Sequence, residues 1–252
     1  MPGGDELVCL TCDGTYCGLL SALFEAHAMK PPPDEVYLSN PAQQLLFAQY
    51  IHVPTDQAKA KRIERAIVEK LSPTTIDHVR MLASSAVPEA GTLLLRYLKL
   101  GWKVGKSLDD HLVKSEVMDV IMLSRHVGWE INKLLGMARF NETEGGVLYC
   151  VLEPDHDIVP HLAEHFEIRM PMENWVIHDI THGTAALHRP GESRIVRGAH
   201  TAQNLPEGDI YEDLWRAFYD AVAIKERVSA KRRRALMPKR YWKHLPEVSP
   251  KR

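Results

Sequence analysis

Apolar residues recur along the first 136 positions in patterns that predict one strand followed by several helices. Residues 6–12 form a short apolar run typical of a strand, and Leu19, Leu20 and Leu23 share one face of a helix over residues 16–28. Thr55 and Asp56 are suited to cap a helix that reaches about Leu71. Further apolar spacing predicts helices near residues 74–86, 89–103 and 115–136.

The pattern changes to β-prone runs after Met137. The runs ARFNE and GVLYCVLEP are separated by a glycine-rich turn, and NWVIHDIT and TAALHRP flank His182 and Gly183. Each pair predicts an antiparallel hairpin. A helix is expected between the hairpins, over residues 155–168. A long amphipathic helix is expected from about Asp209.

These elements together predict an α+β fold. We expect an antiparallel sheet made of the N-terminal strand and the two hairpins of the C-terminal half, covered by a helical region and by the long C-terminal helix. A chain of 252 residues can bury a large core. The sequence therefore predicts one compact domain over residues 1–252, with a helical subregion at about 55–136 and a basic segment at 225–252.

Charge is distributed unevenly along the chain. The net charge is −2, but residues 225–252 contain 11 Lys and Arg against Glu226 and Glu247, which makes this segment +9. The first 224 residues therefore carry −11. A basic segment attached to an acidic body predicts contact with a polyanion at one place.

No membrane segment or export signal is indicated. The N-terminus lacks an apolar stretch, and no run approaches 18 apolar residues, so we expect a cytoplasmic protein with no membrane contact.

Cys9 and Cys12 have the C-x-x-C spacing of zinc sites, with Cys17 close by and Cys150 distant. In a strand, however, positions 9 and 12 point to opposite faces, which favours buried thiols over a metal or redox site.

Several stretches resemble a bacterial family known as domain of unknown function 4130. The stretches lie in the same order as in that family and are Asp13-Gly14-Thr15 with Gly18, Thr55-Asp56 with Lys59, Glu130 to Gly136 with Arg139-Phe140, His165-Phe166 with Arg169, Glu173-Asn174-Trp175 with Asp179, and Met237-Pro238 with Arg240-Tyr241-Trp242 and Leu245. Two features depart from the family pattern. His182 stands where relatives tend to have Arg or Lys, and the opening cysteines have no counterpart.

The resemblance implies a role in DNA metabolism or DNA repair. Such proteins are typically encoded beside a radical-SAM protein, and in some bacteria they are fused to a uracil-DNA-glycosylase-like domain. A radical-SAM protein or a uracil-DNA-glycosylase-like protein is therefore an expected partner, besides DNA. The family has no established catalytic residues, so the resemblance assigns none.

Histidine and carboxylate residues between positions 156 and 200 form the first group of candidate site residues. His161 and His165 lie at i, i+4 on the expected helix, and Asp179 and His182 follow on the hairpin. These four are candidate metal ligands, although no metal is assigned. His165, Asp179 and Glu130 are candidate catalytic residues. The alternative is that Asp179 pairs with Arg169 or Arg139 and holds the helix to the sheet.

Cations and aromatic residues form the second group, with two interpretations left open. In the basic segment they can contact phosphates and stack on bases, or they can dock on the body as a hydrophobic latch. Arg139, Arg169 and Trp175 are a possible second nucleic-acid contact, or part of a salt-bridge cluster. The candidates in the basic segment are Arg232, Arg233, Arg234, Lys239, Arg240, Tyr241, Trp242 and Lys243.

Three functions follow from these observations. We expect a nucleic-acid-associated accessory protein of DNA repair or DNA modification. The alternatives are a metal-dependent phosphodiesterase or nuclease that uses His and Asp residues, and a protein adaptor for a radical-SAM enzyme. No cofactor is indicated. The glycine-rich phosphate loops and the G-x-S-x-G motif are missing from the sequence, so a nucleotide hydrolase and a serine hydrolase gain no support.

Overall fold

The structure is a computed structural model that describes residues 7–41, 44–143, 146–198 and 237–245. The chain divides into two compact units, residues 1–128 and 129–252, and each is described by itself. The single domain expected from the sequence stays a prediction. The described helices contain no segment of the length and apolarity needed to cross a membrane.

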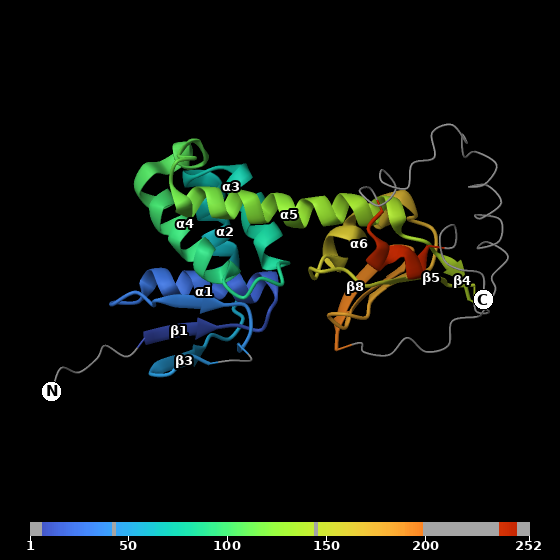
Figure 1. Cartoon of the computed structure of the whole chain (residues 1–252), viewed down its shortest axis with the longest axis horizontal. Coiled ribbons are helices and arrows are strands. Elements are labelled where there is room, and N and C mark those ends of the chain that lie inside the picture. The colour runs from blue at the N-terminus through green and yellow to red at the C-terminus, as the bar shows by residue number, and fades with distance from the viewer. Residues whose placement is uncertain (1–6, 42–43, 144–145, 199–236, 246–252) are drawn as a thin grey trace. The chain divides into compact units, whose positions relative to one another are not determined.

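Unit 1 contains a three-stranded parallel sheet with the strand order β2-β1-β3. The strands are β1 (Leu7–Thr11), β2 (Glu35–Tyr37) and β3 (Ala48–His52). Helix α1 (Tyr16–Ala28) connects β1 to β2 and lies along the sheet (Figure 1). A helical crossover of this kind is what makes neighbouring strands parallel.

Three helices of unit 1 begin at a residue whose side chain caps the helix. Thr15 caps α1, Asp56 caps α2 (Gln57–Lys70), and Ser72 caps α3 (Pro73–Ala83), each by accepting a hydrogen bond from a backbone N–H of the first turn. Helix α4 (Ala90–Val104) leads through a 3₁₀ turn, η1 (Gly105–Asp110), to α5 (Ser115–Met137), which contributes residues to both units.

Helix α4 covers β2, one of the two edge strands of this sheet. The contact is very close, because a Cβ added at Gly91 would lie 2.3 Å from the carbonyl oxygen of Val36. Thr92 accepts a hydrogen bond from the backbone N–H of Val36 at 3.0 Å. Glycine is therefore required where α4 meets the strand.

Unit 2 contains a mixed sheet with the strand order β4-β5-β6-β7-β8. Strands β5 and β6 are parallel, with helix α6 (Val159–Arg169) between them in sequence, and the other pairs are antiparallel. The strands are β4 (Asn141–Glu142), β5 (Leu148–Leu152), β6 (Trp175–Asp179), β7 (Thr184–Arg189) and β8 (Glu192–Arg197).

Aromatic rings fill the core of unit 2. Phe140 and Phe166 meet edge to face with centroids 4.9 Å apart, and both lie beside Trp175. Trp175 is fully buried and stacks on His188, with centroids 4.7 Å apart. This ring cluster joins the segment that follows α5, helix α6 and the sheet.

The structure confirms the α+β class and both hairpins but corrects the predicted sheet. The N-terminal strand pairs with β2 and β3 instead of with the C-terminal hairpins, and the second sheet is mixed because α6 carries the chain from β5 to a parallel β6. The helix expected at 155–168 begins only at Val159. The helix expected from Asp209 lies outside the described residues.

Gly91→Ala should destabilise the protein by about 1–3 kcal/mol, because the new methyl group would collide with the backbone of β2. Urea denaturation of the native protein and the variant measures this difference. Gly128→Ala in α5 is the matched control. Nothing lies within 4 Å of a Cβ at Gly128, so alanine there should stabilise by up to about 1 kcal/mol. Equal effects at the two sites would contradict the close contact.

Candidate functional site

Polar side chains gather in unit 2 where the parallel strands β5 and β6 end. Glu153, Asp155 and Asp157 follow β5, and Asp179 is the last residue of β6. Asp179 is paired across the sheet with Thr184, and Thr184 with Arg197. The carboxyl ends of parallel strands are where α/β proteins commonly bind ligands, because the connecting loops leave a crevice there.

Asp179 and His182 form a hydrogen-bonded pair in the turn between β6 and β7. The Nδ1–H of His182 donates to Asp179 Oδ2 at 2.6 Å, and Asp179 Oδ1 accepts from the backbone N–H groups of Thr181 and His182 at 2.8 and 3.1 Å. Asp179 is fully buried, whereas the side chain of His182 is 23% exposed. The hydrogen bond leaves Nε2 to take up or release a proton, so the pair can act as a general acid or base.

The pKa of His182 is raised. The hydrogen bond to Asp179 is the main cause, and the charges of Asp179, Asp157 and Glu130 add to it, while partial burial acts in the opposite direction. Asp157 and Glu130 therefore lie close enough to influence the imidazole. Asp157 is paired with Arg197, whose guanidinium also lies 3.5 Å from the hydroxyl of Thr184.

Glu130 of α5 places a buried carboxylate beside this group. Its Oε1 accepts the backbone N–H of Asp155 at 2.8 Å, and its Oε2 accepts that of His156 at 2.9 Å. Only 5% of Glu130 is exposed. These two bonds hold the chain after β5 in a loop, which explains why α6 starts later than the sequence predicts.

Residues 237–245, here called the docked segment, supply the other partners of this carboxylate. The buried hydroxyl of Tyr241 donates to Glu130 Oε1, and the guanidinium of Arg240 lies 3.5 Å from the same oxygen. Arg240 also pairs with Asp155, and Lys243 pairs with Glu153. The segment forms a short 3₁₀ helix, η3 (Lys239–His244).

Most residues of the docked segment that were expected to contact phosphates or bases are bonded to other side chains of unit 2, as the latch interpretation predicts. Tyr241 and Leu245 are 2% and 1% exposed, and the indole N–H of Trp242 donates to the carbonyl of Met237 at 2.7 Å. Lys239 is exposed, with its ammonium 6.0 Å from the centre of the Trp242 ring. Arg232, Arg233 and Arg234 lie outside the described residues.

The three residues expected at a second nucleic-acid contact have separate roles. Trp175 is buried and stacked on His188, so its ring faces are covered. Arg139 donates to the carbonyls of Gly136 and Ala138 at the end of α5, at 3.0 and 3.1 Å. Arg169 is exposed at the end of α6. Asp179 takes His182 as its partner instead of either arginine.

The histidines and cysteines are not gathered into a metal site in the described ranges. Within those ranges, no three His, Cys, Asp or Glu side chains are arranged to hold a metal ion, which includes His161, His165, Asp179 and His182. His165 is exposed and contacts Phe166 edge to face. Cys9, Cys12 and Cys150 are buried free thiols, and burial raises the pKa of Cys12 to about 11 and that of Cys150 to about 12. These cysteines are therefore protonated near neutral pH.

Sequence reasoning selected Glu130, Asp179 and His182 but missed Asp155, Asp157 and Arg197. A usable signal was present, since a strand, a helix of 11 residues and a second strand are typical of a parallel crossover unit. Acidic residues that follow the first strand of such a unit are expected at the ligand-binding edge. Asp155 and Asp157 follow β5 in this way, whereas Arg197 is the last residue of β8 and pairs with Asp157.

Comparison with known families places the chain in one of them. The sequence pattern of the family described as Domain of unknown function (DUF4130) matches residues 88–247, and the chain belongs to this family. The match contains Glu130, Asp179 and the docked segment, but the resembling stretches at residues 13–18 and 55–59 precede it. No curated protein matches the chain.

Tyr241→Phe should lower the free energy of unfolding by about 1–3 kcal/mol, because the buried carboxylate of Glu130 loses a hydrogen-bond donor. Urea denaturation at pH 7 measures the loss. Tyr50→Phe is the matched control, since Tyr50 accepts a hydrogen bond from the backbone N–H of Leu45 at an exposed position. The control should lose clearly less, and equal losses would refute the role assigned to Tyr241.

His182→Asn should destabilise the protein more at pH 5.5 than at pH 8.5. Asp179 raises the pKa of His182 above its usual 6.5. The pair therefore stabilises the fold fully below the pKa of histidine in the unfolded chain. This stabilisation is lost as the pH rises through the pKa of His182 in the folded protein. Unfolding free energies measured across this range give the difference. His165→Asn controls for loss of an exposed imidazole. A destabilisation by His182→Asn that increases with pH would contradict the pairing of His182 with Asp179.

Proposed function

We propose that the protein is a nucleic-acid-associated accessory protein of DNA repair or DNA modification. The observation that carries the proposal is the concentration of positive charge in residues 225–252, which is +9 against −11 in the rest of the chain. Lys and Arg bind phosphates by releasing condensed counterions, so a cluster of this size favours DNA over a neutral partner. The resemblance to a family linked with DNA metabolism supports the same function.

The docked segment limits which cations are available for phosphates. Arg240 and Lys243 are paired with Asp155 and Glu153, and a phosphate would have to displace those carboxylates. Lys239 and the preceding Arg232, Arg233 and Arg234 are therefore the preferred phosphate contacts. In this proposal the docked segment anchors the basic stretch to unit 2, and unit 2 is brought to the DNA.

Two alternatives remain as proposals of lower rank. The pair of Asp179 and His182 is compatible with acid–base catalysis on a phosphodiester, and cleavage of bound DNA would favour that function. An adaptor for a radical-SAM enzyme would instead bind its protein partner without affinity for DNA. Both outcomes are visible in the experiment that tests the main proposal.

Arg232/Arg233/Arg234→Ala should weaken DNA binding and reduce its dependence on salt. In fluorescence-anisotropy titrations with single- and double-stranded oligonucleotides, with and without uracil, the log–log salt slope for duplex DNA is about −0.9 per phosphate contact. The triple variant should lose about two to three contacts. Lys243→Ala should change the slope little, because its ammonium is paired with Glu153.

Lys61/Arg65/Lys70→Ala is the matched control, because it removes three exposed cations from α2 of unit 1. Its salt slope should equal that of the native protein. If both triple variants lose the same number of contacts, binding is non-specific attraction to any positive surface. No binding of any oligonucleotide at low salt would refute the proposal and leave the adaptor function.

A further inference from the structure

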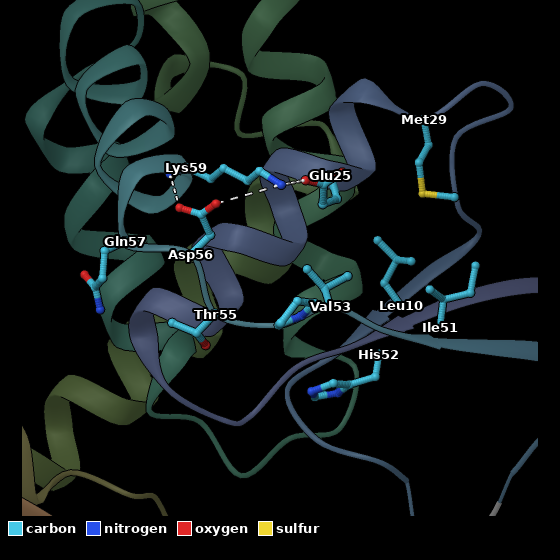
Figure 2. Close-up of a pocket in the computed structure, with 11 residues that line it drawn as sticks. Leu10, Glu25, Met29, Ile51, His52, Val53, Thr55, Asp56, Gln57 and Lys59 are labelled. Atoms are coloured by element: carbon cyan, nitrogen blue, oxygen red, sulfur yellow. Dashed lines mark hydrogen bonds and ion pairs between the residues drawn. The ribbon is translucent and has the colours of Figure 1, made fainter.

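Unit 1 contains a pocket of about 630 Å³ between the edge strand β3 and helices α1 and α2 (Figure 2). This volume lies within the usual range for small-molecule sites. The floor of the pocket is apolar and is built from β1, from β3 with the residue that follows it, and from the residue that follows α1. Its members are Leu10, Met29, Ile51 and Val53.

The topology of the sheet marks the side of this pocket where Thr55, Asp56 and Gln57 follow β3. The chain passes from β1 outward to β2 and then returns past β1 to β3, so the connections that leave the carboxyl ends of β1 and β3 diverge. Ligands of open parallel sheets bind at such a switch point. The loops that follow the two strands are joined by a hydrogen bond of 2.6 Å from the hydroxyl of Thr55 to Asp13 Oδ2.

The first turns of both helices are fixed around this point. A Cβ at Gly18 would lie 2.0 Å from Asp13 Oδ1, so the carboxylate of Asp13 packs directly on the backbone of α1. Asp56 caps α2 by accepting the N–H groups of Ala58 and Lys59 at 2.8 and 3.1 Å. The N–H groups of Ala58 and Lys59 in α2 are thus already satisfied by a carboxylate, which disfavours a phosphate here.

The rim of the pocket combines two carboxylates and one amide with the ammonium of Lys59, the hydroxyl of Thr55 and the imidazole of His52. Figure 2 shows Lys59 extending toward Glu25 above the strands, with Asp56 beneath it; the ammonium lies 2.6 Å from Glu25 and 3.9 Å from Asp56. Gln57 is exposed at the mouth of the pocket. Two carboxylates against one ammonium favour a ligand that donates hydrogen bonds and carries no negative charge in the pocket.

We propose that this pocket binds a nucleobase. A base has two flat apolar faces, which suit a floor of Leu, Ile, Val and Met, and ring N–H and amino donors along its edge, which suit Glu25 and Asp56. The amide of Gln57 can both donate to and accept from a base edge. The inference rests on the proposed association with nucleic acid, and it adds a base-recognition site in unit 1 to the phosphate contacts of the basic segment.

The test is titration of the full-length protein with free adenosine, guanosine, cytidine and thymidine. Isothermal calorimetry and saturation-transfer NMR detect the binding. At least one nucleoside should bind. Ile51→Trp fills the pocket and should weaken binding at least about tenfold, which corresponds to about 1.4 kcal/mol. Gln57→Ala removes the amide and should weaken binding about fivefold, as expected for one hydrogen bond of about 1 kcal/mol.

Gln49→Ala is the matched control, because Gln49 is an exposed glutamine on β3 outside the pocket lining, and it should leave binding unchanged. Circular dichroism checks that each variant is folded. If Ile51→Trp does not fold, Gln57→Ala decides, since Gln57 is exposed. Absence of nucleoside binding at millimolar concentration overturns the inference, as does binding that neither pocket variant weakens.

Oligonucleotide binding measured on the same preparations separates this inference from the proposed function. If oligonucleotides bind through the basic segment but no nucleoside binds, only the base pocket is refuted. If nucleosides bind but oligonucleotides do not, the pocket stands as a nucleoside site and the association with DNA is refuted. Binding of nucleosides that persists in Arg232/Arg233/Arg234→Ala is expected, because that variant leaves the pocket intact.

Discussion

The buried carboxylate of Glu130 is the interaction on which the arrangement of unit 2 depends. A carboxylate removed from water is costly unless its oxygens are fully hydrogen-bonded, and Glu130 obtains its donors from the loop after β5 and from Tyr241. One side chain therefore fixes a helix, a loop and the docked segment together. The loop that carries Asp155 and Asp157 is therefore held in place at the end of β5.

The local elements could be predicted from sequence because their signals are local. The helix expected at 16–28 is found as Tyr16–Ala28, and Asp56 caps α2 as its position suggested. Strand partners could not be read in the same way, because an apolar pattern tells which face of a strand is buried but not which strand lies beside it. The expected sheet was wrong for this reason.

The candidate site shows the same limit. Glu130 and Asp179 stand out as acidic residues within apolar stretches, yet their partners are set by the fold. Asp179 takes a histidine three residues away instead of a distant arginine, and Glu130 takes backbone N–H groups that no side-chain pattern reveals. Composition likewise identified the basic segment, but only the contacts separate paired Arg240 and Lys243 from exposed Lys239.

The hydrogen bond between Glu130 and Tyr241 joins residues that are 111 positions apart. During synthesis on the ribosome, the carboxylate lacks this donor until residue 241 has emerged. A chain interrupted before that point would carry a buried charge with an incomplete set of partners, so unit 2 would be open to proteolysis. The contact thus makes the stability of unit 2 conditional on completion of the docked segment.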